Sequence, residues 1–298
     1  MEKLLVQLQN ASVSWEKNLP LSKHSSFRIG GRADLALFPQ TRAQLIDALS
    51  ILRDANIPTL VIGRGSNVVF PDEGFRGAVL FTSSYRSIHR KEQELEVGAG
   101  APLAAIANTA REAALTGAEF AHGIPGTLGG AVFMNAGAFG GCMADICVSS
   151  EYFDRESGEI RLLEGEAQEF GTRTSVYQRF PERVILGARL MLRQGDAEAI
   201  NAAMLDFIER RRRTQPLELP NAGSVFKRPE GHFAGKLIED CGLKGRRIGG
   251  AEVSEKHAGF IVNRGGATAE DVRRLVDLIR ETVFKETGVE LECEIRFL

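Results

Sequence analysis

The 298-residue sequence has no stretch of about 18 uninterrupted apolar residues, the rough minimum for a membrane-spanning helix. Its first twenty residues also lack the unbroken apolar core and small-residue cleavage site of an export signal. An excess of positive charge, typical of proteins that bind nucleic acid or anionic membranes, is missing too, because the formal net charge is −2. We therefore expect a cytoplasmic monomer whose partner is a small molecule, with neither nucleic acid nor membrane as a partner.

Metal-binding patterns are also missing from the sequence. The four cysteines form no Cys-x-x-Cys pair, and the five histidines form no His-Glu-x-x-His motif. No metal site is expected, and without an export signal a disulfide framework is not expected either. We interpret all four cysteines as small buried apolar residues. The composition, 43% hydrophobic and 26% charged, is that of a globular protein.

The pattern of apolar residues changes near residue 195, from short runs interrupted by glycine to long helical periodicity. This change predicts two domains, 1–195 and 196–298, and the first is predicted to have a further split near residue 80. The first part contains short apolar runs that end near glycines, and an alanine-rich segment over 102–115 that predicts a helix. The apolar runs predict strands over 58–63, 77–82, 94–100 and 183–192. This mixture of helices and strands indicates the α+β class.

The second part contains signals for two long helices. Asp196 can cap a helix that runs to about residue 213, and Thr268 with Asp271 forms a capping box for another that ends at Gly288. Strands are predicted over 258–263 and over the last ten residues. Strand, helix and strand in this order predict a crossover unit.

A glycine turn follows the predicted strand at 58–63. Gly63, Gly65, Ser66 and Asn67 could present main-chain and side-chain donors to a phosphate group. The third glycine of a Rossmann fingerprint is absent, so this is not that motif. A tight turn without a ligand is the alternative.

The segment 122–141 is dense in glycine but carries apolar residues and almost no charge. A flexible linker would be polar, so this segment is predicted to be folded. Glycine at this density allows the backbone to approach a flat partner closely, and a ring-shaped cofactor is one candidate. A tight packing corner within the protein is the other.

Two charged segments have both a structural and a functional interpretation. The four arginines Arg210–Arg213 complement the dipole at a helix C-terminus, or they steer an anionic substrate. In the terminal strand, alternation places Glu292, Glu294 and Arg296 on one face, which is typical of a half-solvated sheet edge.

The segment "NAGSVFKRP" contains Ser224, followed closely by two cations. Ser224 is not part of a Gly-x-Ser-x-Gly nucleophile elbow, so any chemistry it performs must be of another kind.

Five ordered motifs together resemble one known family. They are "GRGSNVVFPDEGFRGAVL", "GIPGTLGGAVFMNAGAFGG", "NAGSVFKRP", "GGAEVSEKHAGFIVN" and "LECEIRF". The sequence is identified by them as a member of the UDP-N-acetylenolpyruvoylglucosamine reductases, flavoenzymes of bacterial peptidoglycan synthesis that support cell shape and cell division. The match runs from about Ser25 to the C-terminus.

The resemblance implies an FAD-binding domain of the vanillyl-alcohol-oxidase (PCMH) type, followed by a smaller α/β substrate-binding domain. FAD and NADPH would be the cofactors. The residues expected near FAD lie in the two glycine segments, with Asn135 and Gly137 nearest to the flavin. They are Gly63, Arg64, Gly65, Ser66, Asn67, Gly123, Ile124, Pro125, Gly126, Gly129, Gly130, Asn135 and Gly137.

The implied reaction reduces the enolpyruvyl ether of UDP-N-acetylglucosamine-enolpyruvate to the lactyl ether of UDP-N-acetylmuramate. By motif, Ser224 supplies the proton, and Arg173 binds the substrate carboxylate. Glu294 would polarise that carboxylate, with Glu292 as the alternative if the register is shifted. Cations such as Lys227 would ease formation of the serine alkoxide.

Lys227 and His257 match positions expected to meet the diphosphate sugar. The sequence lacks the family's tyrosine-bearing loop between Val176 and Val184, so it resembles the shorter, second type. Thr214 stands where relatives often have lysine, so Arg213 is a candidate replacement. A related FAD-dependent alcohol or sugar oxidase and a non-catalytic nucleotide-sugar binding protein are the alternative functions.

Overall fold

The computed structural model describes residues 2–298, and its contacts group them into two compact units. The first unit contains residues 2–18, 34–64 and 76–209, and the second contains 19–33, 65–75 and 210–298. Helices and strands mix throughout, which confirms the predicted α+β class. The contiguous domains 1–195 and 196–298 stay a prediction, because the contact grouping runs through three segments of chain for each unit.

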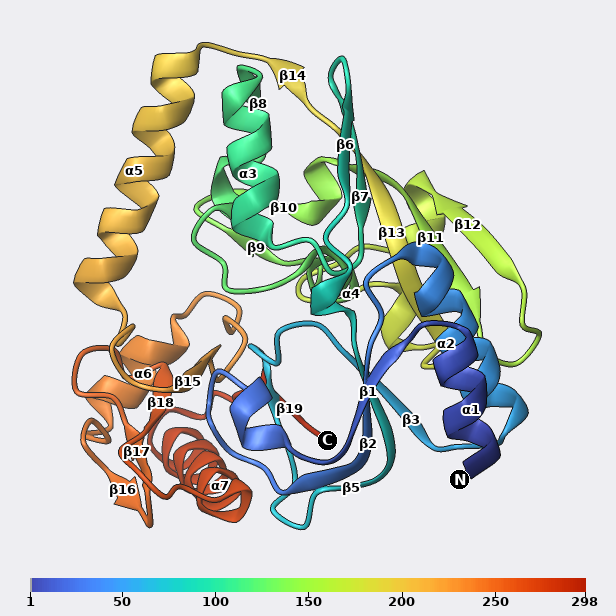
Figure 1. The fold of residues 1–298 in the computed structure, drawn as a ribbon. Helices are drawn as coiled ribbons and strands as arrows, with labels where there is room; N and C mark the ends of the chain where they lie inside the picture. The colour runs from blue at the N-terminus through green and yellow to red at the C-terminus, as the bar shows by residue number, and fades with distance from the viewer. Residues whose placement is uncertain (1) are drawn as a thin grey trace. The chain divides into compact units, whose positions relative to one another are not determined.

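The first unit is built mainly on two sheets (Figure 1). The four-stranded sheet has the order β1-β2-β5-β3, with β1 Ser14–Pro20, β2 Arg32–Phe38, β5 Phe75–Phe81 and β3 Thr59–Ile62. The five-stranded sheet has the order β12-β11-β13-β7-β6, with β12 Ile160–Glu164, β11 Cys147–Asp154, β13 Arg183–Met191, β7 Glu94–Gly98 and β6 Ile88–Lys91. The four predicted strands of this part are thereby confirmed.

Helices cover both sheets of the first unit. They are α1 Glu2–Asn10, α2 Arg42–Asp54, α3 Leu103–Glu112 and α4 Leu128–Met134. A further helix, α5 Ala197–Thr214, begins in the first unit and continues past residue 209 into the second. Apolar residues of α3, α4 and the five-stranded sheet form one core, and those of α1, α2, β2 and β5 form another. The strands β2, β5, β11 and β13 contain consecutive buried residues, so both of their faces are covered, and the apolar stripes of the helices provide this cover.

Shorter elements complete the first unit. Two-stranded pairs are β9 Gly137–Ala138 with β10 Gly141–Cys142, and β14 Arg193–Gln194 with β8 Leu115–Thr116. Short 3-10 helices are η2 Thr82–Ser84, η3 Glu119–Ala121, η4 Met143–Asp145, η5 Gly165–Gln168 and η6 Val176–Gln178. The pair β9–β10 closes the glycine-dense segment of the sequence.

The second unit contains a four-stranded sheet of order β15-β18-β17-β16. Its strands are β15 Asn221–Ser224, β18 Phe260–Asn263, β17 Ala251–Val253 and β16 Arg247–Ile248. Helix α7 Ala269–Thr287 packs on this sheet, with α6 Ala234–Asp240 beside it. A separate parallel pair joins β4 Val68–Val69 to β19 Arg296–Phe297, and η1 Leu21–His24 lies in the same unit.

The core of the second unit draws on all three of its segments. Phe27 and Ile29 come from residues 19–33, Val69 comes from residues 65–75, and all three are buried with the apolar face of α7. The carboxylate of Asp72 accepts hydrogen bonds from the first two N–H groups of α7, at 2.8 and 3.2 Å. These contacts join residues 19–33 and 65–75 to the C-terminal residues within one unit.

The predictions for the two long helices are confirmed. Asp196 accepts a hydrogen bond from the N–H of Ala199 at 2.8 Å at the start of α5. Thr268 and Asp271 form the capping box of α7, and Gly288, with φ of 72°, ends it in the left-handed region that glycine tolerates.

The prediction for the C-terminal strand is wrong in extent and in pairing. Only Arg296–Phe297 is strand, with an isolated bridge between Cys293 and Phe226. This strand pairs with β4 and not with β18, so no crossover unit forms. The alternation is confirmed only for Glu292, Ile295 and Arg296, because Ile295 is buried and the other two are exposed, whereas Cys293, Glu294 and Phe297 are all half-buried.

The four cysteines differ in burial. Cys147 is buried as predicted, whereas Cys142, Cys241 and Cys293 are only partly buried, so the prediction of burial is wrong for these three.

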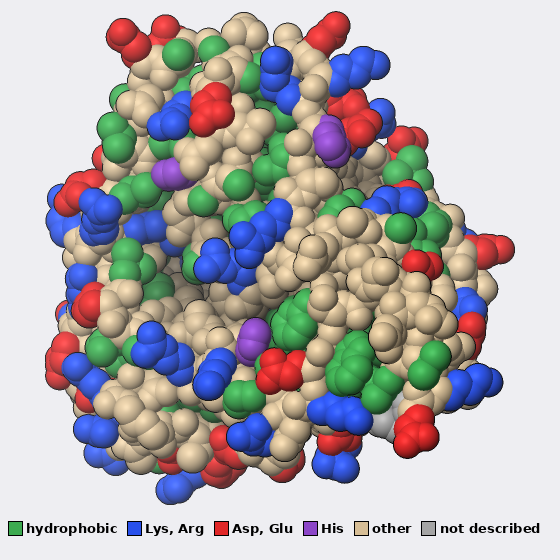
Figure 2. Space-filling model, viewed as in Figure 1, with side chains coloured by type: hydrophobic (Ala, Val, Ile, Leu, Met, Phe, Trp, Pro, Cys, Tyr) green, Lys and Arg blue, Asp and Glu red, His purple; other side chains and the backbone are tan. Residues whose placement is uncertain are grey.

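Within residues 2–298, no helix is long and apolar enough to cross a membrane. On the face drawn in Figure 2, basic and acidic side chains are interspersed.

Candidate active site

The glycine turn after β3 lies against the buried hydroxyl of Thr127. A Cβ atom on Gly63 would lie 2.2 Å from Oγ1 of Thr127, so only glycine fits there. Thr127 is 1% exposed, and its hydroxyl has no hydrogen-bond partner among the described residues. A buried hydroxyl of this kind is costly unless a ligand or water satisfies it. Gly63 and Thr127 therefore fit a phosphate oxygen.

Sequence reasoning missed Thr127. The residue precedes α4 as its N-cap, but its hydroxyl accepts no capping hydrogen bond. A threonine directly before an apolar helical run was the available signal, yet that signal predicts a capping role. The hydroxyl of Thr127 instead lies against the position of Gly63, which only the fold reveals.

The second half of the turn belongs to the second unit. Gly65 has φ of +62°, and a Cβ atom there would lie 2.3 Å from the carbonyl oxygen of His24. Asn67 donates from Nδ2 to the carbonyl oxygen of Glu294 at 3.2 Å. The side chain predicted to bind phosphate is therefore bonded to the C-terminal segment.

The glycine-dense segment folds around α4. A Cβ atom on Gly129 would lie 3.2 Å from Cβ of Ala99, and one on Gly137 would lie 2.7 Å from Cβ of Cys142. These two glycines are explained by packing within the protein. Gly130 differs, because a Cβ atom there would meet only Oγ1 of Thr127 within 4 Å, at 3.9 Å. The packing interpretation therefore holds for Gly129 and Gly137, and the cofactor interpretation of the segment stays a prediction.

Asn135 and Gly137, predicted to lie nearest to the flavin, both contact the loop of Arg173. Nδ2 of Asn135 donates to the carbonyl oxygen of Gly171 at 2.9 Å, and Nη2 of Arg173 donates to that of Gly137 at 2.9 Å. Asn135 and Arg173 both have positive φ, 43° and 56°. Such backbone is strained for residues other than glycine and clusters at functional sites. The first unit therefore brings three predicted site residues together.

The second unit brings Ser224 and Glu294 together, although 70 positions separate them in the sequence. The N–H of Glu294 donates to the carbonyl oxygen of Val225 at 2.7 Å. The N–H of Lys227 donates to the carbonyl oxygen of Glu292 at 2.9 Å, so the two segments run side by side. The Nζ of Lys227 is also hydrogen-bonded to the carboxylate of Glu292. Lys227 is thus paired with Glu292, the alternative glutamate.

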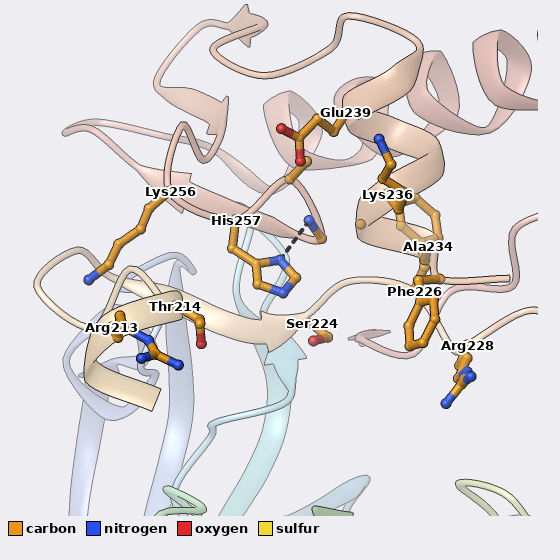
Figure 3. Close-up of a pocket in the computed structure, with 14 residues that line it drawn as sticks. Arg213, Thr214, Ser224, Phe226, Arg228, Ala234, Lys236, Glu239, Lys256 and His257 are labelled. Atoms are coloured by element: carbon orange, nitrogen blue, oxygen red, sulfur yellow. Dashed lines mark hydrogen bonds between the residues drawn. The ribbon is translucent and has the colours of Figure 1, made fainter. Parts of the chain in front are cut away.

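A cavity of about 470 Å³ opens beside Ser224 (Figure 3). Ser224, His257 and Arg213 all line it, which unites three predicted residues from separate motifs. The complete lining consists of Arg213, Thr214, Ser224, Phe226, Arg228, Phe233, Ala234, Gly235, Lys236, Glu239, Lys256, His257, Ala258 and Gly259. Four Lys or Arg residues against one carboxylate give the cavity a positive potential that suits an anionic ligand.

His257 faces the cavity as a neutral ring. Burial lowers its pKa from the ordinary value of about 6.5. Its Nδ1 accepts a hydrogen bond from the N–H of Gly259 at 3.0 Å, so the hydrogen of the neutral ring is on Nε2. In Figure 3 the ring points toward Ser224, between Lys256 and Phe226. Nε2 can therefore donate a hydrogen bond to a ligand in the cavity.

Sequence reasoning missed several cavity residues. Arg228 lies with its guanidinium 4.0 Å from the ring centroid of Phe233, which is 61% exposed. Nζ of Lys256 donates to the carbonyl oxygen of Arg212 at 2.7 Å, beside Arg213. Arg228 was visible as the second cation of "NAGSVFKRP", but Lys256 lies 32 positions after Ser224 and reaches the cavity only through the fold.

Comparison with known proteins identifies the class first. Residues 33–164 match the domain family described as "FAD binding domain". Gly63 and Thr127, with its buried hydroxyl, both lie within this matched range. The chain is therefore a flavoprotein, and its residues fit the FAD that this class binds.

The remainder of the chain identifies the family. Residues 215–298 match "UDP-N-acetylenolpyruvoylglucosamine reductase, C-terminal domain". The reductase of Caldanaerobacter subterraneus subsp. tengcongensis is 46% identical over 94% of this chain and 92% of its own length, and that of Alkaliphilus oremlandii is 45% identical over 94% and 91%. The crystal structure of the Thermus caldophilus reductase has a TM-score of 0.79 and 34% identity, covering 96% of this chain and 98% of its own. The chain belongs to the UDP-N-acetylenolpyruvoylglucosamine reductase family.

Proposed function

We propose that this chain uses NADPH to reduce the enolpyruvyl ether of UDP-N-acetylglucosamine-enolpyruvate to the lactyl ether of UDP-N-acetylmuramate, a precursor of peptidoglycan. Membership of the reductase family makes it an FAD-dependent oxidoreductase. The observation that supports the proposal most is that Ser224 lines a cavity rich in Lys and Arg, while the N–H of Glu294 donates to the carbonyl oxygen of Val225, the next residue along the chain. A cytoplasmic monomer that acts in cell-wall synthesis, and thus in cell shape and division, completes the proposal.

The reaction adds a hydride and a proton across a carbon–carbon double bond. When FAD is bound and has been reduced by NADPH, its chemistry would be to supply the hydride that the terminal methylene carbon of the substrate accepts. Ser224 donates its hydroxyl proton to the neighbouring carbon, where negative charge develops. Ser224 is exposed to the cavity, so its hydroxyl is accessible to a substrate. The lining cations favour the serine alkoxide that remains.

Two further residues act on the substrate carboxylate in this proposal. Arg173 binds it, because a guanidinium stays charged and can hold a carboxylate with two parallel hydrogen bonds. The hydrogen bond from Nη2 to Gly137 and that from Gln178 to its carbonyl oxygen, both 2.9 Å, support a fixed loop for Arg173. Glu294, in protonated or hydrogen-bonded form, polarises the carboxylate and so stabilises the enolate-like charge.

The remaining site residues hold the two nucleotides. Gly63–Ser66 and the segment Gly123–Gly137 would surround FAD, and the hydroxyl of Thr127 would donate a hydrogen bond to a phosphate oxygen. Arg213 and His257 would meet the diphosphate sugar of the substrate, together with the newly found Lys256. Lys227 stays a weaker candidate for this role, because its ammonium group is paired with Glu292. The alternative function is that of a related FAD-dependent oxidase, which would oxidise an alcohol or sugar and pass the two electrons to oxygen.

An anaerobic absorbance experiment tests the proposed function. NADPH should bleach the flavin bands of the purified FAD-loaded protein, and UDP-N-acetylglucosamine-enolpyruvate should then restore them with formation of UDP-N-acetylmuramate, detected by mass spectrometry. Mixing with UDP-N-acetylglucosamine, which lacks the enolpyruvyl group, is the control and should leave the flavin bleached. Recovery only on admission of oxygen would favour the oxidase and contradict the proposal.

A further inference from the structure

Asn67 binds the C-terminal segment at two points within the second unit. Its Nδ2 donates to the carbonyl oxygen of Glu294 at 3.2 Å, and its own carbonyl oxygen accepts from the N–H of Arg296 at 3.0 Å. The parallel pairing of β4 with β19 covers only Arg296 with Val68 and Phe297 with Val69. The side chain of Asn67 therefore adds one bond beyond this ladder, and that bond reaches Glu294.

The main chain of Glu294 is consequently held from two directions. Its N–H donates at 2.7 Å to the carbonyl oxygen of Val225, the residue after Ser224. Its carbonyl oxygen accepts from Asn67. Because the direction of a side chain follows from the orientation of its own backbone, these two bonds fix where the Glu294 carboxyl group starts relative to Ser224.

We propose that Asn67 is a positioning residue that orients Glu294 for proton transfer by Ser224, and not mainly a ligand of FAD phosphate. This inference rests on the proposed function, in which Glu294 acts on the substrate. An amide is suited to the position, because it presents an N–H to the Glu294 carbonyl oxygen. An aspartate of the same shape would place a carboxylate oxygen against that carbonyl oxygen and repel it.

The two roles of Asn67 predict different losses. A residue that binds FAD phosphate should weaken FAD binding when it is replaced. A residue that acts through Glu294 should leave FAD binding and flavin reduction by NADPH intact, because neither step uses Glu294. Only flavin re-oxidation by the enolpyruvyl substrate should then slow down, since that step needs the carboxylate to be polarised.

The experiment compares Asn67→Asp and Asn67→Ala with the wild-type chain, all loaded with FAD. We expect FAD occupancy and the rate of anaerobic reduction by NADPH to stay within about twofold of wild type, while re-oxidation by UDP-N-acetylglucosamine-enolpyruvate slows by roughly tenfold or more. Asn263→Asp is the matched control, because Nδ2 of Asn263 also donates to a backbone carbonyl oxygen, that of Phe27, at 3.0 Å. In the Asn263→Asp variant, the rate of flavin re-oxidation by the substrate should fall no more than the rate of flavin reduction by NADPH. If Asn67→Asp does not fold, Asn67→Ala and Asn67→Gln provide the same comparison.

A double-mutant cycle separates positioning from a general structural effect. In a Glu294→Gln background, Asn67→Asp should slow re-oxidation by less than about twofold, because the group on which Asn67 acts has already been altered. Full additivity, loss of FAD occupancy or equal loss of both half-reactions would overturn the inference. Absence of substrate-driven re-oxidation in the wild-type protein would instead contradict the proposed function, so the two failures are distinguishable.

Discussion

At the scale of single residues, the second unit places a weak acid, Ser224, in a setting that favours its anion. A serine hydroxyl does not give up a proton readily in water, so catalysis requires positive charge near the alkoxide. Arg213 and Lys256 line the same cavity, whereas Lys227 is paired with Glu292. The cations around Ser224 are therefore partly different from those that the local sequence suggests.

His257 gives this site a testable pH dependence of stability. Burial lowers the pKa of the folded imidazole, whereas the unfolded histidine binds a proton at about pH 6.5. Below that pH the unfolded state binds the extra proton first, so the free energy of unfolding falls as the pH falls. A single group of this kind contributes at most about 1.4 kcal/mol per pH unit.

Replacing His257 by glutamine should flatten this dependence between pH 7.5 and about 5.5, as measured by urea unfolding. Burial lowers the pKa of His122 as well, so part of the slope should remain in the variant. His89, exposed on β6, is the control, and His89→Gln should leave the slope of the wild type. The same slope in His257→Gln and wild type would contradict a lowered pKa for the half-buried His257.

At the scale of elements, the end of β3 and the start of α4 are fitted to one another through Gly63 and Thr127. A Cβ atom on Gly63 would meet Oγ1 of Thr127 at 2.2 Å, but the next nearest atom, Cβ of Thr127, at 3.4 Å. Gly63→Ala should therefore be strained mainly by one hydroxyl. Removing that hydroxyl relieves the contact and leaves ordinary van der Waals spacing.

We expect Gly63→Ala to lower the free energy of unfolding by about 1–3 kcal/mol and to reduce FAD occupancy. The double variant Gly63→Ala/Thr127→Ala should recover most of the stability but not the FAD occupancy, because the hydroxyl that fits a phosphate oxygen is then missing. Urea unfolding and flavin absorbance of the purified proteins check both quantities. Equal destabilisation in the single and double variants would show that the hydroxyl is not the source of strain.

Local signals predicted individual elements well but not their pairing. Asp196, Thr268 and Gly288 have capping chemistry that acts within one turn of helix, so α5 and α7 could be located from the sequence. The C-terminal residues alternate as a strand should, but alternation does not specify a partner. Their partner is β4, more than 220 positions earlier, and the choice depends on how the whole second unit folds.

The same distinction applies to the candidate site. Ser224, Glu294 and Arg173 were identified by resemblance to a family, because no local pattern around them specifies chemistry. The structure places the main chain of Glu294 beside Val225, the residue after Ser224, and the roles of the two side chains stay predictions. Thr127 and Lys256 could not be recognised, since the role of each depends on a neighbour distant in sequence. The contact of Asn67 with Glu294 was hidden for the same reason.

At the scale of the whole molecule, the second unit is assembled from three separated segments. Phe27, from the first of them, is fully buried in the core that α7 completes. Removal of a large buried aromatic side chain leaves a cavity that the surroundings fill only partly. A substitution near the N-terminus should therefore act on the C-terminal part of the chain.

Phe27→Ala should lower the free energy of unfolding by about 3–5 kcal/mol and should speed hydrogen exchange in peptides from α6 and α7. Phe284→Ala is the control, because Phe284 lies on α7 but is 52% exposed, and its replacement should have a small effect. Urea unfolding and hydrogen–deuterium exchange with mass spectrometry provide the two measurements. Faster exchange confined to residues 2–60 would contradict a core shared between these segments.

The proposed function depends on Ser224 as the proton donor. One rapid-mixing measurement tests this role of Ser224 most directly. Wild-type protein and Ser224→Ala are each reduced by NADPH without oxygen and then mixed with UDP-N-acetylglucosamine-enolpyruvate. The variant should be reduced at close to the wild-type rate, but its flavin should re-oxidise slower by about 10²–10⁴-fold, the usual effect of losing a proton donor. Re-oxidation at the wild-type rate, or equal loss of both steps, would contradict Ser224 as the proton donor.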